Sequence, residues 1–344
     1  MNRETFTKWF GGPLLHAHLH QEGRIVDPDV ELHQFTQLGA LNYFTRLTGR
    51  NCALISDTNH AMIEIYRHRQ DWQQGQTETD QSFSRRKIEF ASDDILRRSQ
   101  ETNSISNILT GVETDILNEK GDVSTTEAVM KKLDIVIASL HWRTWKKFTG
   151  NGEISETTKI KILSAYSQLA DNPDVDILGH PTVFPDELKA FFCAEDLRPV
   201  LEKMKSHNMA MEVNISVDLT LPEFNLERDL MVVAGKVGVP IAIGSDLHHL
   251  KDYQLPGVYP DYITGENWND AFCFHQSSGC HFALFRFIAK NIRLLESTGI
   301  SPENVINSSY ENFTFWLTRR NPLSAGRIYQ YPGGNQIDRS IGNT

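Results

Sequence analysis

Residues 13–20, Pro-Leu-Leu-His-Ala-His-Leu-His, join an apolar run to three histidines at alternate positions, His16, His18 and His20. Alternate residues of a β-strand share one face, so the three imidazoles are expected to point one way while residues such as Leu15 point toward covering helices. Three adjacent imidazoles are costly to bury unless a cation holds them neutral. The stretch therefore predicts a strand that carries metal ligands on one face.

Six further short apolar runs end on a polar residue, and a segment with helical periodicity follows each of the seven runs. This alternation indicates βα units around a parallel sheet. The predicted strands are residues 13–20, 52–57, 108–113, 133–141, 175–180, 209–214 and 239–246. The predicted helices are residues 31–47, 84–102, 125–132, 156–171, 194–206, 227–237 and 281–298, with a last helix near 310–318.

The composition excludes several classes of protein. With 344 residues, of which 40% are hydrophobic and 23% charged, the chain can fill a sizeable core and is not intrinsically disordered. Its 34 basic and 44 acidic residues give a net charge of −10, which opposes nucleic acid as a primary partner. The sequence contains no GxGxxG or P-loop pattern, which argues against a dinucleotide-binding fold.

The same sequence bears on domain organisation and location. No apolar stretch approaches the roughly 18 residues that a membrane helix needs, and the N-terminus has no signal-peptide run. Four scattered cysteines are too few for a disulfide framework. We therefore expect a soluble, cytoplasmic protein with no membrane partner and leave its oligomeric state open. One domain is expected over residues 1–344, with loop insertions at about 70–84 and 251–279 and a flexible tail at 327–344.

The ends of the predicted strands carry residue types that bind metal ions. Glu113 ends the third strand, in ILTGVETD, and His141 and His180 end almost wholly apolar strands, in IVIASLHW and VDILGHP. Asp246 and His248 follow in IAIGSDLHH. Because the carboxyl ends of parallel strands gather on one face of a barrel, these side chains are expected to meet there.

In chain order, the motifs HxH, GxE, SxH, GHP and GSDxH resemble those of the polymerase and histidinol phosphatase (PHP) family of metal-dependent phosphoesterases. The resemblance implies an α/β fold, a distorted (β/α)7 barrel, with two or three divalent ions of Zn, Mn or Fe at the strand ends. Glu113 matches the family's bridging carboxylate. The metal ligands that the resemblance implies are His16, His18, His20, Glu113, His141, His180, Asp246 and His248.

The match to the family pattern leaves two points open. The family's HxH pair falls either on the first two of the three alternating histidines or on the last two. At the second strand end, the usual Asp-His becomes Asp57-Thr58, so one ligand of a third metal is replaced. If the pair is His16 and His18, the position of the loop ligand of that third site also falls near Arg24. A two-metal centre is then expected, unless His20 or His60 substitutes through a shifted loop. Both two and three ions therefore stay possible.

The resemblance implies that the chain hydrolyses a small phosphorylated substrate, a phosphate monoester or diester, by a metal-bound hydroxide. Glu113, Asp246 and Arg24 form the expected catalytic set, with Asp246 or a nearby imidazole handling the proton. Arg24 and Arg143 are the expected contacts of the substrate phosphate, and Lys146 is a further candidate. The identity of the substrate is not predicted.

Two other functions fit parts of the pattern. An amidohydrolase, such as a deaminase or amidase, also places HxH on its first strand and Asp on its last. Those barrels have eight strands and bridge their metals at the fourth strand, where this chain has His141. A non-catalytic metal-binding module is the other alternative, supported by Thr58 and Arg24.

Overall fold

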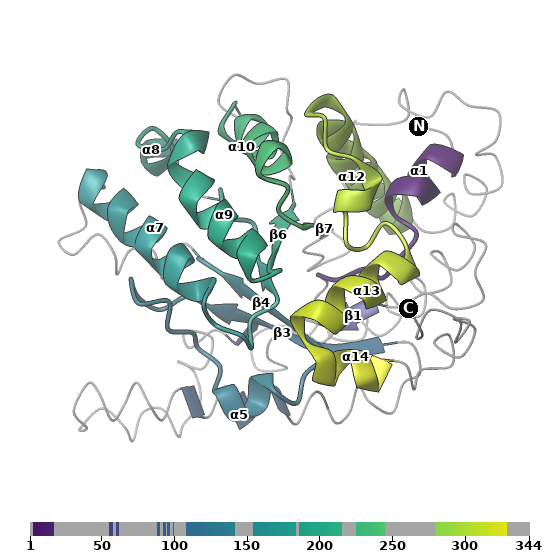
Figure 1. Cartoon of the computed structure of the whole chain (residues 1–344), viewed down its shortest axis with the longest axis horizontal. Helices are drawn as coiled ribbons and strands as arrows, with labels where there is room; N and C mark the ends of the chain where they lie inside the picture. Colours follow the sequence, from purple (N-terminus) through teal and green to yellow (C-terminus); the bar gives the residue numbers. More distant parts are fainter. Residues whose placement is uncertain are drawn as a thin grey trace.

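The computed structural model shows an α/β protein in which helices surround a parallel sheet (Figure 1). The residues that it describes are 3–16, 55–57, 60–61, 88–89, 92–93, 95–96, 99, 108–141, 154–183, 186–214, 225–244 and 279–328.

The sheet has seven strands within the described residues, and every pairing between them is parallel. From β3 to β7 each strand pairs with the next one in the chain, and β1 and β2 both pair with β3. A doubly wound sheet would reverse its strand order at a switch point, whereas this order is consistent with a (β/α) barrel-like fold. The strands are β1 (Ile55–Asp57), β2 (His60–Ala61), β3 (Ile108–Asp115), β4 (Ile135–Ser139), β5 (Ile177–Leu178), β6 (Ala210–Val213) and β7 (Ile241–Ile243).

A segment near the C-terminus joins β7 to the start of the chain. Val305 forms a parallel bridge with Ile241 in β7. The Asn307 amide donates to Ile243 O at 2.8 Å and to Pro13 O at 3.1 Å, while its oxygen accepts from Ile243 N at 3.0 Å. Gly12 N also donates to Asn307 O at 3.1 Å. Residues 12–13 are therefore held beside β7, the last strand in the order.

The helices pack on the outer face of the sheet, which carries Val112, Val136 and Met211. Figure 1 shows α7, α9, α10 and α12 following one another around this face. The α-helices are α1 (Arg3–Trp9), α5 (Glu127–Met130), α7 (Glu156–Leu169), α8 (Asp186–Lys189), α9 (Arg198–Ser206), α10 (Asn225–Val237), α12 (Gly279–Ser297), α13 (Tyr310–Arg320) and α14 (Pro322–Ile328). Two short 3-10 helices are η3 (Ala194–Leu197) and η7 (Pro302–Asn304).

The inner face of the sheet, which is the face that carries Glu113, holds a second and smaller apolar cluster. Strand register places Ile137 and Ala242 on this face, and Phe313 of α13 packs with them. Leu15 belongs to this inner cluster, so the expectation that it faces the covering helices is wrong. The reason is local: residues 15–16 have no strand pairing, and strict alternation of faces holds only within a paired strand.

Helices α13 and α14 lie at the amino-terminal ends of the strands. Trp316 Nε1 donates to Asn208 O at 2.9 Å, just before β6, and Ser324 Oγ donates to Leu133 O at 3.0 Å, just before β4. The carboxyl ends of the strands lie on the opposite side. That opposite side is where the sequence predicts the functional residues.

Most predicted elements are confirmed. Each of the six predicted strands from 52–57 onward contains an observed strand, and the helices expected from residue 125 onward correspond to α5, α7, η3 with α9, α10, α12 and α13. The described residues between 88 and 99 are helical, as predicted. Strand β2 and helices α1, α8 and α14 are additional. Among the described residues, no helix is long and apolar enough to cross a membrane.

Several predictions fall wholly or partly outside the described residues. These are the end of the first strand at 17–20, the helix at 31–47, the insertion at 70–84, nearly all of the insertion at 251–279, and the tail beyond residue 328. The first two residues of the predicted tail, 327–328, belong to the end of α14.

Candidate metal centre

Glu113 is the central residue of the site. It lies on the inner face of β3, where its Cα pairs with that of Ile137 in β4, and it has 0% exposure. An isolated carboxylate at such a position is costly to bury, because the ionised form loses its hydration. Positive charge or hydrogen-bond donors must therefore be directed at it.

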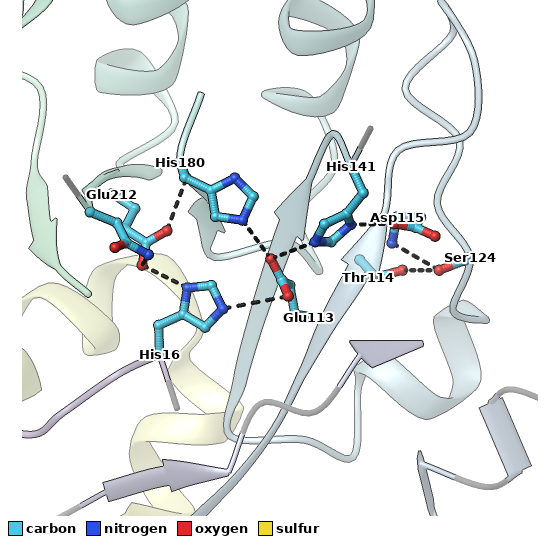
Figure 2. A network of polar contacts seen from close by, with 9 residues as sticks. His16, Glu113, Thr114, Asp115, Ser124, His141, His180 and Glu212 are labelled. Atoms are coloured by element: carbon cyan, nitrogen blue, oxygen red, sulfur yellow. Dashed lines mark hydrogen bonds and ion pairs between the residues drawn. The ribbon is translucent and has the colours of Figure 1, made fainter. Parts of the chain in front are cut away.

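Three imidazoles converge on the Glu113 carboxylate (Figure 2). His180 Nε2 lies 2.9 Å from Oε1, and His141 Nε2 lies 3.2 Å from the same oxygen. His16 Nε2 lies 3.5 Å from the other oxygen, Oε2. The rings of His16 and His180 are stacked, with centroids 5.9 Å apart, and His141 meets His180 edge to face. The three histidines come from the first segment and from the ends of β4 and β5.

This arrangement suits a divalent cation. Glu113, His141 and His180 each offer a ligand atom, and the three atoms lie within 4.8 Å of one another. Imidazole nitrogens with a carboxylate oxygen form a donor set that Zn, Mn and Fe all accept. A cation between these atoms would also balance the buried negative charge. The donor chemistry therefore fits a metal ion.

Two more carboxylates, those of Asp115 and Glu212, contact the ring nitrogen of His141 and of His16 that does not face Glu113. His141 Nδ1 hydrogen-bonds to Asp115 Oδ1, and His16 Nδ1 lies 2.6 Å from Glu212 Oε1. In each histidine the other nitrogen, Nε2, faces Glu113. A carboxylate on one imidazole nitrogen is the arrangement that fixes a histidine tautomer and ring orientation at metal sites.

The charge around His141 changes its proton affinity. Burial by itself lowers the pKa of this imidazole, but the Glu113 and Asp115 carboxylates outweigh burial and raise the pKa well above its usual value. The same negative field that holds a proton on the imidazole favours a cation beside it.

Two glycines provide the room that the site needs. A β-carbon at position 179 would lie 2.1 Å from Ser139 Oγ, and one at position 244 would lie 1.6 Å from Glu212 Oε1. Only glycine fits such close approaches. The next residue after Gly179, His180, has a φ of +23°, a backbone conformation that is uncommon for residues other than glycine. The glycines of the GHP and GSD motifs are therefore explained by packing around the site.

The structure brings together four of the predicted site residues, His16, Glu113, His141 and His180. The Cα of His60 pairs with that of Glu113, although the side chain of His60 lies outside what the structure describes. The other predicted site residues lie outside the described residues: His18, His20, Arg24, Arg143, Lys146, Asp246 and His248.

Sequence reasoning missed the two carboxylates that hold the histidines. Asp115 comes two residues after Glu113, so the strand period of two already places both on one face. Glu212 is a charged residue within the otherwise apolar run MAMEV, a position where a buried acid needs a partner. Both signals are present in the sequence but become specific only when the strands are placed side by side.

Comparisons with known proteins point to phosphatases. The chain is 36% identical over 146 residues to a probable phosphatase of Caldanaerobacter subterraneus, covering 41% of this chain and 50% of that protein. A probable phosphatase of Thermoanaerobacter sp. is also 36% identical, over 41% of this chain and 52% of the relative. The chain thus spans about half the length of these relatives. No family model matches the sequence.

A further relative is matched over more of its length. A probable phosphatase of Caldicellulosiruptor saccharolyticus is 31% identical over 187 residues, which cover 54% of this chain and 71% of that protein. The chain therefore belongs to the family of these probable phosphatases.

Proposed function

We propose that this chain is a metal-dependent phosphatase that hydrolyses phosphate esters of small molecules. The observation that carries the proposal is the buried Glu113 carboxylate with three imidazoles directed at it, at the carboxyl ends of parallel strands. Membership in a family of probable phosphatases supplies the reaction class. A (β/α)7 barrel of the PHP type is the fold that we propose for the whole chain, and the strand order supports it.

The two oxygens of Glu113 face different histidines and would each be available to a separate ion. Its Oε1 faces His141 and His180, and its Oε2 faces His16. The first set would hold one ion and the second set another, and His18, Asp246 and His248 would complete the ligands. The contact of His16 with Glu113 supports the register in which the HxH pair is His16 and His18. A third ion would need His20 or another residue in place of the ligand lost at Thr58.

Paired divalent ions, when bound, lower the pKa of a water molecule and neutralise charge on a phosphoryl group. The residues of this chain keep the donors in place for that chemistry. Asp115 and Glu212 hold the Nδ1 atoms of their histidines, so that Nε2 is directed inward. Asp246 is our candidate for the proton transfer, and Arg24 and Arg143 are candidates for contacts to the substrate phosphate.

The test measures metal content and hydrolysis on the same purified chain. We expect bound Zn, Mn or Fe by elemental analysis, and release of phosphate from a generic ester such as p-nitrophenyl phosphate. Glu113→Gln should lose both, since it removes the charge that the two sets of ligands share. Asp171→Asn, a change of an exposed carboxylate that pairs with Lys203, is the matched control and should keep both.

Release of ammonia from amide or aminopurine substrates, without release of phosphate, would show that the chain is an amidohydrolase and not a phosphatase. Bound metal with neither activity over a broad panel of phosphate esters would favour the non-catalytic module. The protein would also be purified without chelator and incubated with Zn, Mn or Fe. If it then held no metal, the proposal would be contradicted directly.

A further inference from the structure

Glu212 is a buried acid that contacts two histidines of the candidate metal centre. It lies on β6, with 2% exposure, on the same face of the sheet as Ala242 of β7. Its Oε1 lies 2.6 Å from His16 Nδ1, and its Oε2 accepts a hydrogen bond of 2.9 Å from the backbone N–H of His180. Asn214 Nδ2 lies 3.4 Å from Oε1.

The contact to the His180 backbone lies where the chain needs support. His180 has a φ of +23°, and a residue other than glycine persists in such a strained conformation only when its surroundings hold it there. A charge-assisted hydrogen bond to its N–H is one such constraint. The same backbone conformation directs His180 Nε2 to 2.9 Å from Glu113 Oε1. Glu212 thus acts on the direction of His180 without touching its ring.

The contact to His16 determines which nitrogen carries a proton. An ionised carboxylate only accepts hydrogen bonds, so when Glu212 carries its charge, His16 Nδ1 is the donor in their contact. With the proton on Nδ1, the Nε2 lone pair is available on the side of Glu113 Oε2. Metal ligation by a histidine requires that bare nitrogen.

The space for Glu212 is built into β7 and the residues that follow it. A β-carbon at position 244 would lie 1.6 Å from Glu212 Oε1 and 2.5 Å from its Cδ, so any residue larger than glycine would displace the carboxylate. Three parts of the chain that are distant in sequence therefore meet at this side chain: His16, His180 and Gly244.

We propose that Glu212 is a positioning residue of the metal centre, which fixes the tautomer of His16 and the backbone of His180 through its two oxygens. The proposal rests on the proposed function in so far as the centre binds metal. It assigns a role to a residue that is not itself a ligand and that no motif in the sequence singles out.

The Glu212→Gln variant separates this role from simple space filling. A glutamine has the same shape but only one acceptor oxygen, and the His180 N–H can only donate. If the amide oxygen accepts from that N–H, the amide NH₂ faces His16 Nδ1, which must then accept and hold its proton on Nε2. The substitution is therefore expected to reverse the His16 tautomer and block its ligating nitrogen.

Two measurements test the proposal. The first is nitrogen-15 NMR of histidine-labelled, metal-free protein, with the His16 signal assigned by its loss in a His16→Asn variant. We expect a proton on Nδ1 of His16 in the unmodified chain and its loss in Glu212→Gln. The second is titration with Co²⁺ followed by its visible absorption, in which Glu212→Gln should bind about 10–100-fold more weakly.

Asp134→Asn is the matched control. Asp134 is also a buried acid that accepts from a neighbouring strand, at 2.9 Å from both Thr110 N and Thr110 Oγ1, but it lies before β4, at the opposite end of the sheet. We expect Asp134→Asn to keep the Co²⁺ affinity within about threefold. Circular dichroism and thermal unfolding of both variants check that each one is folded.

Each outcome decides the proposal. Retention of the Nδ1 proton in Glu212→Gln, or Co²⁺ affinity within about threefold of the unmodified chain, would overturn it. An equal loss of affinity in Asp134→Asn would also overturn it, because the effect would then be a general loss of stability. If the unmodified chain binds no Co²⁺, the proposed function fails, and the tautomer of His16 alone decides the role of Glu212.

Discussion

His180 directs its Nε2 to within 2.9 Å of Glu113 Oε1, although β5 and β3 are separated in the sheet by β4. Neighbouring strands lie about 4.8 Å apart, so side chains two strands away meet only when both point to the same concave face. This contact therefore depends on the path of the whole sheet and on the unusual backbone of His180.

Replacement of His180 by asparagine tests the ligand role with little change to the backbone. Asparagine tolerates positive φ better than most residues, so the fold should be kept while the Nε2 donor is lost. We expect metal affinity and phosphate release to fall by at least about 100-fold, which exceeds the usual effect of an outer-sphere change. Thermal unfolding of metal-free protein should stay within about 4 °C.

His207→Asn is the control for this change, because His207 is an exposed histidine that pairs with Asp171 at the end of α9. It should have no effect on metal content. Full metal binding by the His180 variant would show that His180 is not a ligand, and the proposed ligand set around Glu113 Oε1 would then be wrong.

Asp115 is expected to act on metal affinity through His141. In Asp115→Asn, the amide can present a donor or an acceptor to His141 Nδ1, so the orientation of the ring is no longer fixed by charge. We expect about a 10–100-fold loss in metal affinity, with the rate at saturating metal reduced less than the affinity. Calorimetric titration with Zn²⁺, followed by assays at several metal concentrations, would measure the two effects separately. Loss of rate without loss of affinity would contradict this role.

The sequence was sufficient for six of the seven predicted strands and for the central acid and histidines, whereas the described residues 13–16 of the first predicted strand form only an isolated bridge. Glu113, His141 and His180 each follow an apolar run, and the strand period places Glu113 on the inner face. Such local patterns survive folding because burial and strand pairing reinforce them. The order of the motifs added the expectation of a metal centre, and the contacts of these three residues agree with it.

The residues that sequence reasoning missed depend on contacts between distant parts of the chain. Glu212 lies 196 residues from His16, and Asn307 lies 294 residues from Pro13. Nothing in the local pattern around either residue tells which backbone or side chain it will meet. The prediction for Leu15 failed for a different reason. It relied on the alternation of faces along a strand, but residues 15–16 have no strand pairing, and Leu15 packs in the inner cluster.

A buried acid at the amino-terminal end of the sheet predicts a pH dependence of stability. Burial raises the pKa of Asp176 from 3.8 to about 7. The charge of Arg320 and the hydrogen bond that Asp176 accepts from Val136 N lower the pKa, but burial outweighs them. The folded protein therefore keeps this proton up to about pH 7, whereas the unfolded chain releases it near pH 4. Because the folded state binds more protons in this interval, the free energy of unfolding falls as pH rises from about 4 to about 7.

Asp176→Asn should remove that contribution, since the amide oxygen can still accept from Val136 N. The free energy of unfolding of the variant, minus that of the unmodified chain, should increase from pH 5 to pH 8 by on the order of a few kcal/mol. Urea unfolding at both pH values measures this difference, and subtraction of the two proteins removes the effects of other titrating groups. Parallel pH profiles for the two proteins would show that Asp176 titrates near its ordinary value.

Asn307→Asp tests how the segment before His16 is held to β7. The Asn307 side chain is fully buried, and its NH₂ group donates to Pro13 O and Ile243 O while its oxygen accepts from Ile243 N. Aspartate has nearly the same shape but places an acceptor oxygen against two carbonyl oxygens. We expect the free energy of unfolding to fall by about 3 kcal/mol or more, because both carbonyls lose their donor and a charge is buried.

The matched change is Asn304→Asp in η7, where the side-chain oxygen accepts from Ser301 Oγ and an aspartate can do the same. It should alter stability by less than about 0.5 kcal/mol. The position of Asn307 also predicts a functional effect, because residues 12–13, which it holds, lead directly to His16. Asn307→Asp should therefore weaken metal binding at temperatures where the rest of the protein is still folded, and hydrogen exchange at residues 12–16 should rise first. Unchanged exchange in this segment would show that other contacts hold the first histidine in place.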